Sequence, residues 1–231
     1  MNWSGLSTPK WPGKISNEDA KTKIGEKLAA RAQDGQVIGI GSGSTSFLAL
    51  LALAQRVNHE SLAIRCVPTS LEIESYCTAL GLSVTTLVNS RPDWAFDGAD
   101  EIDPGHNLIK GRGGAFVREQ LVFASAPKRV ILVDESKFVP TLGEKFSVPL
   151  AVVPEAANLV RMTVSAELGT SPTVRPAGGK DGGVIDEQGS LVMDLKIDGS
   201  RSPSELERFL LTVPGISATG LFVGYEMEVI T

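Results

Sequence analysis

The chain has 231 residues, of which 42% are hydrophobic and 21% are charged. These proportions are ordinary for a globular protein with a buried core, and they exclude a largely disordered chain. The formal net charge of −5 argues against a duplex nucleic acid partner, because such a partner requires a basic face. No apolar run reaches about eighteen residues, so no membrane span and no membrane partner are predicted.

The N-terminal segment 1–15 contains Trp3 and Trp11 and lacks the apolar stretch of a secretory signal. It is expected to be a flexible tail. The cysteines are Cys66 and Cys77, and Cys66 lies in an apolar run typical of a strand. Two reduced, structural thiols are expected, which suits a reducing compartment, and the protein is predicted to be cytoplasmic.

Residues 16–133 alternate between helical and strand patterns. A helix is predicted to begin at Ser16, which has capping-box spacing with Asp19, to bury Ala20, Ile24 and Leu28, and to end at Gly35. Further helices are predicted at 47–57, 70–80 and 117–124, and strands at 37–40, 63–67, 84–87, 94–96 and 129–133. Apolar strands that alternate with helices predict a parallel sheet covered on both faces, a doubly wound α/β domain.

The pattern changes near residue 145. A strand at 150–153 is followed by a helix at 154–168, by a hairpin of 184–186 and 191–194, and by a helix over 204–211 with Ser204 and Glu207 in capping-box spacing. This order predicts a small α+β domain over 145–217. The strand-like segment 220–230 is expected to rejoin the main sheet, so the main domain is predicted to comprise 16–144 plus 218–231.

A glycine-rich turn joins the first predicted strand to the next helix and contains Ser42, Gly43, Ser44 and Thr45. Glycines allow a ligand to approach the backbone closely, and the N–H groups that open a helix favour an anion. The spacing matches neither a dinucleotide fingerprint nor a Walker loop. A phosphate-binding turn and a plain tight turn both remain open.

An acidic segment, 97–103, directly follows another apolar strand and includes Asp97 and Asp100. Ligands of open α/β sheets bind beyond the carboxyl ends of the strands, so these carboxylates could hold hydroxyl groups or transfer protons. The alternative is a solvated loop in which Asp100 caps a turn. No metal site is predicted, because calcium-loop spacing is absent and the chain has two histidines.

A second glycine-rich segment, 110–115, begins with Lys110, whose ammonium group could stabilise an oxyanion or bind a phosphate. Glu119 follows on the predicted helix; considered alone, it is more typical of a helix surface. Lys137 follows the strand that ends at Val133, and its alternative is a solvated loop residue. Four polar loops that each follow a predicted strand indicate one convergent site.

Taken together, these motifs resemble the type A ribose-5-phosphate isomerase family over nearly the whole chain, from about residue 17 to 231. The matching stretches are 41–45, 67–70, 97–101, 110–115, 118–119, 134–137, 213–216 and 220–222. The resemblance implies a Rossmann-like main domain and a smaller ferredoxin-like domain, in a homodimer or homotetramer. It also implies a small sugar phosphate as substrate, with no cofactor and no metal.

The family's roles imply that Glu119 is the general base of an aldose–ketose isomerisation and that Lys110 stabilises the oxyanion. Asp97 and Asp100 are expected to hold hydroxyls and to assist ring opening. The residues expected to surround the substrate are Ser42, Gly43, Ser44, Thr45, Gly98, Ala99, Gly111, Arg112, Gly113, Lys137 and Lys21.

One position departs from the family, which usually has glycine where this chain has Arg112. An arginine there either crowds the ligand or turns outward. Two other functions stay open: a coenzyme A transferase, in which a glutamate is a covalent nucleophile, and a sugar-phosphate-sensing regulatory domain. No basic or helix-turn-helix segment supports the sensor.

Overall fold

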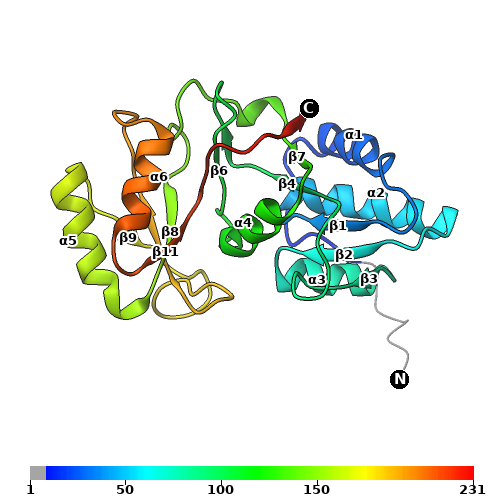
Figure 1. Ribbon diagram of the computed structural model, residues 1–231, viewed down its shortest axis with the longest axis horizontal. Coiled ribbons are helices and arrows are strands. Elements are labelled where there is room, and N and C mark those ends of the chain that lie inside the picture. The colour runs from blue at the N-terminus through cyan, green and yellow to red at the C-terminus, as the bar shows by residue number, and fades with distance from the viewer. Residues whose placement is uncertain (1–8) are drawn as a thin grey trace. The chain divides into compact units, whose positions relative to one another are not determined.

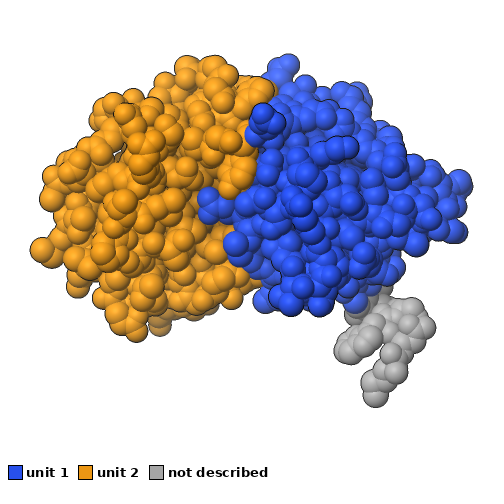
Figure 2. Space-filling model, viewed as in Figure 1, with its two compact units in different colours: residues 1–98, 118–136, 226–231 blue, residues 99–117, 137–225 orange. Residues whose placement is uncertain are grey.

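The computed structural model describes residues 9–231 and contains helices, a parallel sheet and smaller antiparallel sheets (Figure 1). The chain forms two compact units (Figure 2). Unit 1 comprises the segment that ends at Gly98 together with 118–136 and 226–231, and unit 2 comprises 99–117 and 137–225.

Unit 1 is built on a parallel six-stranded sheet in the order β13-β7-β4-β1-β2-β3. Its strands are β1 (Val37–Ile40), β2 (Arg65–Pro68), β3 (Ser83–Val84), β4 (Trp94–Gly98), β7 (Arg129–Leu132) and β13 (Glu228–Ile230). From β1 the chain proceeds to β2 and β3 on one side, and then to β4, β7 and β13 on the other. The predicted α/β class with a parallel sheet is confirmed. Of the predicted strand-like segment 220–230, residues 228–230 return to this sheet, whereas 221–222 join another sheet.

Helices cover both faces of this sheet because its strands are apolar on both sides. The helices are α1 (Glu18–Ala29), α2 (Ser44–Glu60), α3 (Leu71–Ala79) and α4 (Phe116–Ser125), of which α1 and α2 lie side by side (Figure 1). Ile38 and Ile40 of β1 belong to the core that contains α1, α2 and α3. Val37 belongs to a second cluster with Val122 of α4.

The predicted start of the first helix is wrong. Asn17, in a left-handed conformation with φ 51°, precedes α1, and no side-chain hydrogen bond caps the helix. Lys21 is buried and Ala20 is exposed. Helix α2 begins at Ser44 and not at Phe47, because its first turn is polar and an apolar period does not reveal it. In α3, by contrast, the Ser70 side chain accepts a hydrogen bond from Ile73 N, as a helix cap should.

Unit 2 contains an antiparallel four-stranded sheet in the order β11-β8-β10-β9. Its strands are β8 (Val148–Val152), β9 (Thr173–Val174), β10 (Leu191–Leu195) and β11 (Ile216–Thr219), and its helices are α5 (Ala157–Leu168) and α6 (Pro203–Thr212). The capping box of α6 is formed by Ser202 and Glu205, two positions before the predicted one. Strand β10 forms ladders with β8 and β9. The predicted hairpin segment 184–186 is not a strand, but it meets the start of β10 through an isolated bridge at Ile185 and a hydrogen bond from Val192 N to Val184 O at 2.9 Å.

The boundaries between the two units differ from those predicted for the two domains. Residues 99–117, 137–144 and 218–225 belong to unit 2. They include the three-stranded sheet of β5 (Glu101–Ile102), β6 (Leu108–Ile109) and β12 (Leu221–Phe222). Ile109 and Leu221 pack into the core that contains β8, which explains the assignment. Strands of two residues carry no periodicity that a sequence could display.

Part of the predicted flexible tail lies outside the described residues, namely 1–8. Within 9–15, Ile15 is buried and the Trp11 ring lies 5.5 Å from the Phe47 ring, so part of this segment packs against unit 1. Cys66 and Cys77 are free and buried, as predicted.

Within residues 9–231, no helix combines the length and apolar character that crossing a membrane requires.

Candidate functional site

The carboxyl edge of the sheet in unit 1 carries most of the predicted polar loops. The chain changes direction between β1 and β4, and in open α/β sheets such a switch point is where ligands bind. The loop 41–43 leaves β1 at this point, and Asp97 and Gly98 end β4.

Asp97 organises the glycine-rich loop. This carboxylate is 2% exposed, and its Oδ1 accepts hydrogen bonds from Ser42 N at 3.1 Å and from Gly98 N at 2.7 Å. The Ser46 hydroxyl approaches the same oxygen at 3.4 Å. A Cβ atom on Gly41 would lie 2.4 Å from Asp97 Oδ1. Glycine is therefore needed at position 41 so that the loop can approach the carboxylate.

Substituting Gly41 by alanine is expected to lower the free energy of unfolding by about 1–3 kcal/mol, the usual cost of overpacking. The added methyl group must displace either the loop or the Asp97 carboxylate. Thermal or denaturant unfolding measures the effect. Gly178→Ala is the matched control, because a Cβ at Gly178 meets no atom within 4 Å. Equal stability of the two variants would contradict the role given to Gly41.

The amino end of α2 is suited to an anion. Gly43, with φ +88°, occupies the cap position and has no side chain to bond the first N–H groups of the helix. Ser44 and Thr45 are the first two helical residues, and the first turn contains no acidic side chain. The lack of a side-chain cap and the helix dipole favour a phosphate or carboxylate here.

A hydroxyl cluster beside this turn was missed by the sequence analysis as a site feature. Ser42 Oγ lies 2.7 Å from Thr69 Oγ1 and 3.1 Å from Ser70 Oγ. Thr69 and Ser70 follow β2, and both are buried. Their place after a strand, like that of the other loops, was the available signal, and they lie within the stretch 67–70 that matched the family.

Glu119 is not a surface residue, which the sequence had left as its more common alternative. It is 6% exposed and lies in the first turn of α4. Helix α4 is held close to β1, since a Cβ on Gly39 would lie 2.6 Å from Val122. The preceding residue, Arg118, donates from Nη2 to Pro68 O at 3.3 Å. A carboxylate buried near a helix start is suited to proton transfer more than to solvation.

Lys21 lies beneath the glycine-rich loop and not at an open surface. It is 3% exposed, and its Nζ donates to Ser44 Oγ at 3.2 Å. Asp134, which follows β7, lies 3.9 Å from the same nitrogen. The substrate contact expected of Lys21 from the resemblance stays a prediction, and Asp134 was not among the predicted site residues.

In unit 2, the Lys110 side chain is almost enclosed. It is 3% exposed, and Nζ lies over the Phe222 ring, 5.5 Å from its centroid. The following residue, Gly111, has φ +98°, and a Cβ there would lie 2.7 Å from Phe116. A buried ammonium group at the start of a tight glycine-rich turn can stabilise an oxyanion because little water competes with it.

Arg112 turns outward, which settles its direction. Its side chain is 67% exposed and its Nε lies 3.8 Å from Asp100 Oδ1, while its backbone N donates to Asp100 Oδ2 at 2.9 Å. Asp100 therefore anchors the loop that follows Lys110. Arg175, which the sequence analysis missed, donates from Nη1 to the carbonyls of Gly111 and Arg112 at 2.9 Å each.

The remaining acids of the segment 97–103 have structural partners. Glu101 is fully buried and accepts from Gly143 N at 2.6 Å and from Phe146 N at 2.7 Å. Asp103 accepts from Asn107 N at 2.8 Å and so closes a turn. Lys137 is half-buried, with Nζ 5.5 Å from the centroid of the Phe146 ring. The segment thus mixes loop anchors with candidate site residues.

The predicted residues are distributed over both units. Unit 1 holds Lys21, Ser42, Gly43, Ser44, Thr45, Asp97, Gly98 and Glu119, and unit 2 holds Ala99, Asp100, Lys110, Gly111, Arg112, Gly113 and Lys137. Direct bonds join Ser42 to Asp97, Lys21 to Ser44, and Arg112 to Asp100. Among residues 9–231, no group of three or more His, Cys, Asp or Glu side chains is placed to hold a metal ion.

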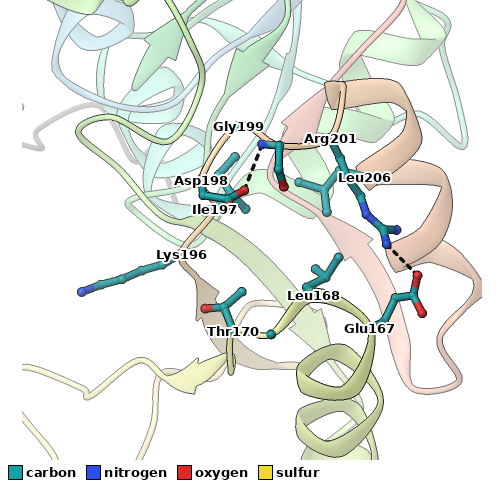
Figure 3. A pocket seen from close by; sticks show the side chains of 11 residues that line it. Glu167, Leu168, Thr170, Lys196, Ile197, Asp198, Gly199, Arg201 and Leu206 are labelled. Carbon is teal, nitrogen blue, oxygen red and sulfur yellow. Dashed lines mark hydrogen bonds and ion pairs between the residues drawn. The ribbon is translucent and has the colours of Figure 1, made fainter.

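A cavity of about 410 Å³ in unit 2 is lined by residues near the end of α5, after β10 and at the start of α6 (Figure 3). Leu168, Ile197 and Leu206 line it, and Arg201 pairs with Glu167 at 2.6 Å. The Lys196 side chain points away from it (Figure 3). None of the predicted site residues lines this cavity, so it is separate from the chemistry considered above.

Comparison with known proteins identifies the relatives of this chain. The family model for ribose 5-phosphate isomerase A (phosphoriboisomerase A) matches residues 65–231. The ribose-5-phosphate isomerase A of Synechococcus sp. is 43% identical over 206 residues, which cover 88% of each chain. That of Natronomonas pharaonis is 40% identical over 213 residues, which cover 92% of each chain.

Solved structures of ribose 5-phosphate isomerases superpose on this chain along nearly its whole length. Ribose 5-phosphate isomerase A from Methanocaldococcus jannaschii superposes with a TM-score of 0.89 at 36% identity, over 94% of this chain and 96% of its own. A D-ribose-5-phosphate isomerase in complex with phospho-erythronic acid superposes with a TM-score of 0.88 at 30% identity, over 93% of this chain and 96% of its own.

Proposed function

The chain belongs to the ribose 5-phosphate isomerase A family, which interconverts ribose 5-phosphate and ribulose 5-phosphate, and we propose that it does so through a cis-enediolate with Glu119 as general base. The burial of Glu119 in the first turn of α4 carries the proposal, because an enclosed carboxylate can transfer a proton where little water competes. The phospho-erythronic acid bound by one structural relative, a sugar-acid phosphate, supports a substrate of this class.

The reaction requires one proton to move between neighbouring carbons. Glu119 removes the proton at C2 of the open-chain aldose, and the electron pair forms the C1–C2 double bond while the aldehyde oxygen becomes negative. Lys110 stabilises that charge. Glu119 then returns its proton to C1, and the O2 proton moves to O1, so that C2 becomes the ketone and O1 a hydroxyl group; no redox partner is required.

The other assignments follow the chemistry of each group. Asp97 and Asp100 hold sugar hydroxyls and assist ring opening, and Ser42, Gly43, Ser44 and Thr45 bind the phosphate at the amino end of α2. Lys137 adds a positive charge. The substrate contacts are completed by Gly98, Ala99, Gly111, Gly113 and the backbone of Arg112, whose side chain turns outward. Phosphate binding contributes orientation at C1 and C2, which a substrate without phosphate would lack.

The decisive experiment is turnover. Protein dialysed against a chelator is expected to convert ribose 5-phosphate to a ketopentose phosphate, detected by a ketose-specific colour reaction or by NMR. A sensor would bind ribose 5-phosphate without converting it. A coenzyme A transferase would form a covalent thioester on a glutamate in the presence of an acyl-coenzyme A. Loss of activity after dialysis, restored by a divalent metal, would contradict the metal-free assignment.

Substituting Lys137 by alanine is expected to raise KM for ribose 5-phosphate about tenfold with little change in kcat, the scale of one charged hydrogen bond. The reason is loss of a cation that binds the phosphate in ground and transition states alike. Steady-state kinetics measures both constants. Lys180→Ala, at an exposed lysine, is the control. An unchanged KM would remove Lys137 from the phosphate site.

We also propose a fold class for the sheet of each unit. We assign unit 1 to a Rossmann-like class because its strand order reverses at β1. The small sheet has the element order β8-α5-β9-β10-α6-β11 and the spatial order β11-β8-β10-β9, which is the arrangement of a ferredoxin-like domain. A cytoplasmic location and a homodimer or homotetramer stay predictions; light scattering on the purified protein measures the assembly.

A further inference from the structure

An arginine of unit 2 bonds the backbone of the glycine-rich loop that follows Lys110. Arg175 Nη1 donates to Gly111 O and to Arg112 O, each at 2.9 Å. The Arg175 side chain is 16% exposed, although arginine is ordinarily solvated. No step of the isomerisation proposed above uses this guanidinium group. An arginine that is largely buried and bonds two neighbouring carbonyls is a built feature of the loop.

The four-stranded sheet of unit 2 places Arg175 beside this loop. Arg175 directly follows β9, and its backbone N donates to Val192 O of β10 at 2.9 Å. Because side chains alternate between the two faces of a sheet, the register puts Arg175 and Asp194 on the same face. Met193 and Leu195, on the other face, pack in the core with α5 and α6. The guanidinium group therefore lies on the face away from this core.

Asp194 fixes the orientation of the guanidinium group. Its Oδ2 accepts from Arg175 Nε at 2.9 Å, and its Oδ1 accepts from Arg175 Nη2. This bidentate pair holds the plane of the arginine fork. The remaining nitrogen, Nη1, carries two hydrogens, one for each of the two loop carbonyls. The donors of Arg175 are thus divided between Asp194 and the loop.

The loop itself has little intrinsic stiffness. Gly111 has φ +98° and Gly114 has φ +88°, and glycine adopts negative φ about as readily as positive φ. Gly114 N donates to Gly111 O at 3.0 Å, which closes a turn. Asp100 Oδ2 accepts from Arg112 N at 2.9 Å. A peptide unit is planar, so bonds to its carbonyl and to its N–H together fix the plane that follows Gly111.

We infer that Arg175, fixed by Asp194, is a positioning residue that holds the glycine-rich loop in the conformation that places the Lys110 ammonium group on the oxyanion. Lys110 N donates to Gly220 O at 2.9 Å, so the backbone is held before Lys110. Arg175 holds the backbone after it. The identity of the oxyanion rests on the proposed function. Arg175 acts through the loop and not by contact with the substrate.

The first test is Arg175→Met, which keeps an unbranched stem and removes the guanidinium group. The kcat for ribose 5-phosphate is expected to fall about 10- to 100-fold, the effect of a misplacement of about 1 Å. KM should change less than about threefold, because the negative charge develops only after the substrate has bound. Steady-state kinetics separates the two constants. An unchanged kcat would overturn the inference.

The second test, Arg175→Lys, separates geometry from charge. Two bonds to Asp194 and two to the carbonyls need four donors, whereas an ammonium group has three. The kcat of Arg175→Lys is therefore expected to lie within about threefold of the value for Arg175→Met. Lysine can still pair with Asp194, so a merely structural ion pair would be restored. Wild-type kcat in Arg175→Lys would overturn the inference, also where Arg175→Met fails to fold.

The third test is a double-mutant cycle with Lys110→Met. If Arg175 acts through Lys110, Arg175→Met is expected to lower kcat by less than about threefold in the Lys110→Met background. Equal factors in both backgrounds would show that Arg175 acts independently of Lys110 and would overturn the inference. A general loss of stability would lower the melting temperature and leave the two factors multiplicative.

Arg201→Met is the matched control. Arg201 also pairs with a carboxylate of unit 2, Glu167 at 2.6 Å, but it lines the cavity of about 410 Å³ described above (Figure 3). Its kcat and KM are expected to stay at the wild-type values. A loss of kcat equal to that of Arg175→Met would show a general effect of losing an ion pair in unit 2 and would overturn the inference.

The proposed function and the positioning role of Arg175 can fail separately. If the wild-type protein does not convert ribose 5-phosphate, the proposed function fails. Amide hydrogen exchange of residues 111–115 in the wild type and in Arg175→Met then decides whether Arg175 positions the loop. Faster exchange confined to this segment of the variant supports the role, and unchanged exchange, or faster exchange throughout unit 2, overturns it.

Discussion

Substitution of Glu119 by glutamine is expected to lower kcat for ribose 5-phosphate isomerisation by at least about 100-fold, the contribution of a positioned general base. Glutamine has nearly the same size and shape as glutamate but cannot accept the C2 proton. Glu119 is 6% exposed in the first turn of α4, so an isosteric side chain should be accommodated. Steady-state kinetics and circular dichroism measure activity and folding.

Solvent exchange gives a second measurement of the same role. In deuterated water, the wild-type enzyme is expected to place deuterium at the carbon that receives the returned proton, to an extent set by exchange on the base. The Glu119→Gln variant is expected to lose this incorporation together with turnover. Glu26→Gln, at an exposed position of α1, is the control and should keep wild-type kinetics. Near-normal turnover by Glu119→Gln would remove Glu119 from the mechanism.

Substitution of Lys110 by methionine is expected to lower kcat by about 100-fold or more, because removal of one oxyanion donor costs on that order. KM should change little, since the negative charge develops only as the proton leaves C2. Methionine keeps an unbranched stem that can pack on Phe222, over which the Lys110 ammonium lies at 5.5 Å. The fold should therefore persist, and thermal unfolding checks this.

The control for Lys110 is Lys196→Met, because Lys196 is exposed and directed away from the cavity of unit 2 (Figure 3). It should keep wild-type kcat. The double variant Glu119→Gln/Lys110→Met tests whether both groups act on one enediolate. Its loss is expected to be smaller than the product of the single losses, as for groups that act as a unit. Strictly multiplicative losses would contradict a shared intermediate.

Much of the fold could be predicted because its signals are local. The apolar run at β1 and the polar turn that follows it are legible within a few residues, and they locate the glycine-rich loop correctly. Helix ends were less predictable: α2 begins at Ser44, in a polar turn that apolar periodicity does not detect. Strands β5 and β6 were missed because each has only two residues, whereas β12 lies within the predicted segment 220–230 but pairs with β6 and not with the main sheet. Their pairing decides which unit contains Lys110, and that pairing depends on distant segments.

The candidate site shows the same division. Motif spacing identified Asp97, Lys110 and Glu119 as chemistry-bearing residues. It left open whether Glu119 is exposed and where Arg112 points, and it proposed direct substrate contact for Lys21. Burial and ion pairs in the folded protein answer the first two questions, because each depends on neighbours that other segments supply, whereas the contact of Lys21 with substrate stays a prediction.

By itself, the sequence determined the α/β class, the order of the polar loops along the sheet and the kinds of side chain available for proton transfer and anion binding. Only the tertiary structure decided which of these groups are buried and what holds them. Local patterns report interactions between near neighbours, whereas Ser42 reaches Asp97 across 55 positions and Asn17 reaches Asp134 across 117. Such contacts exist only once the sheet has brought the ends of its strands to one edge.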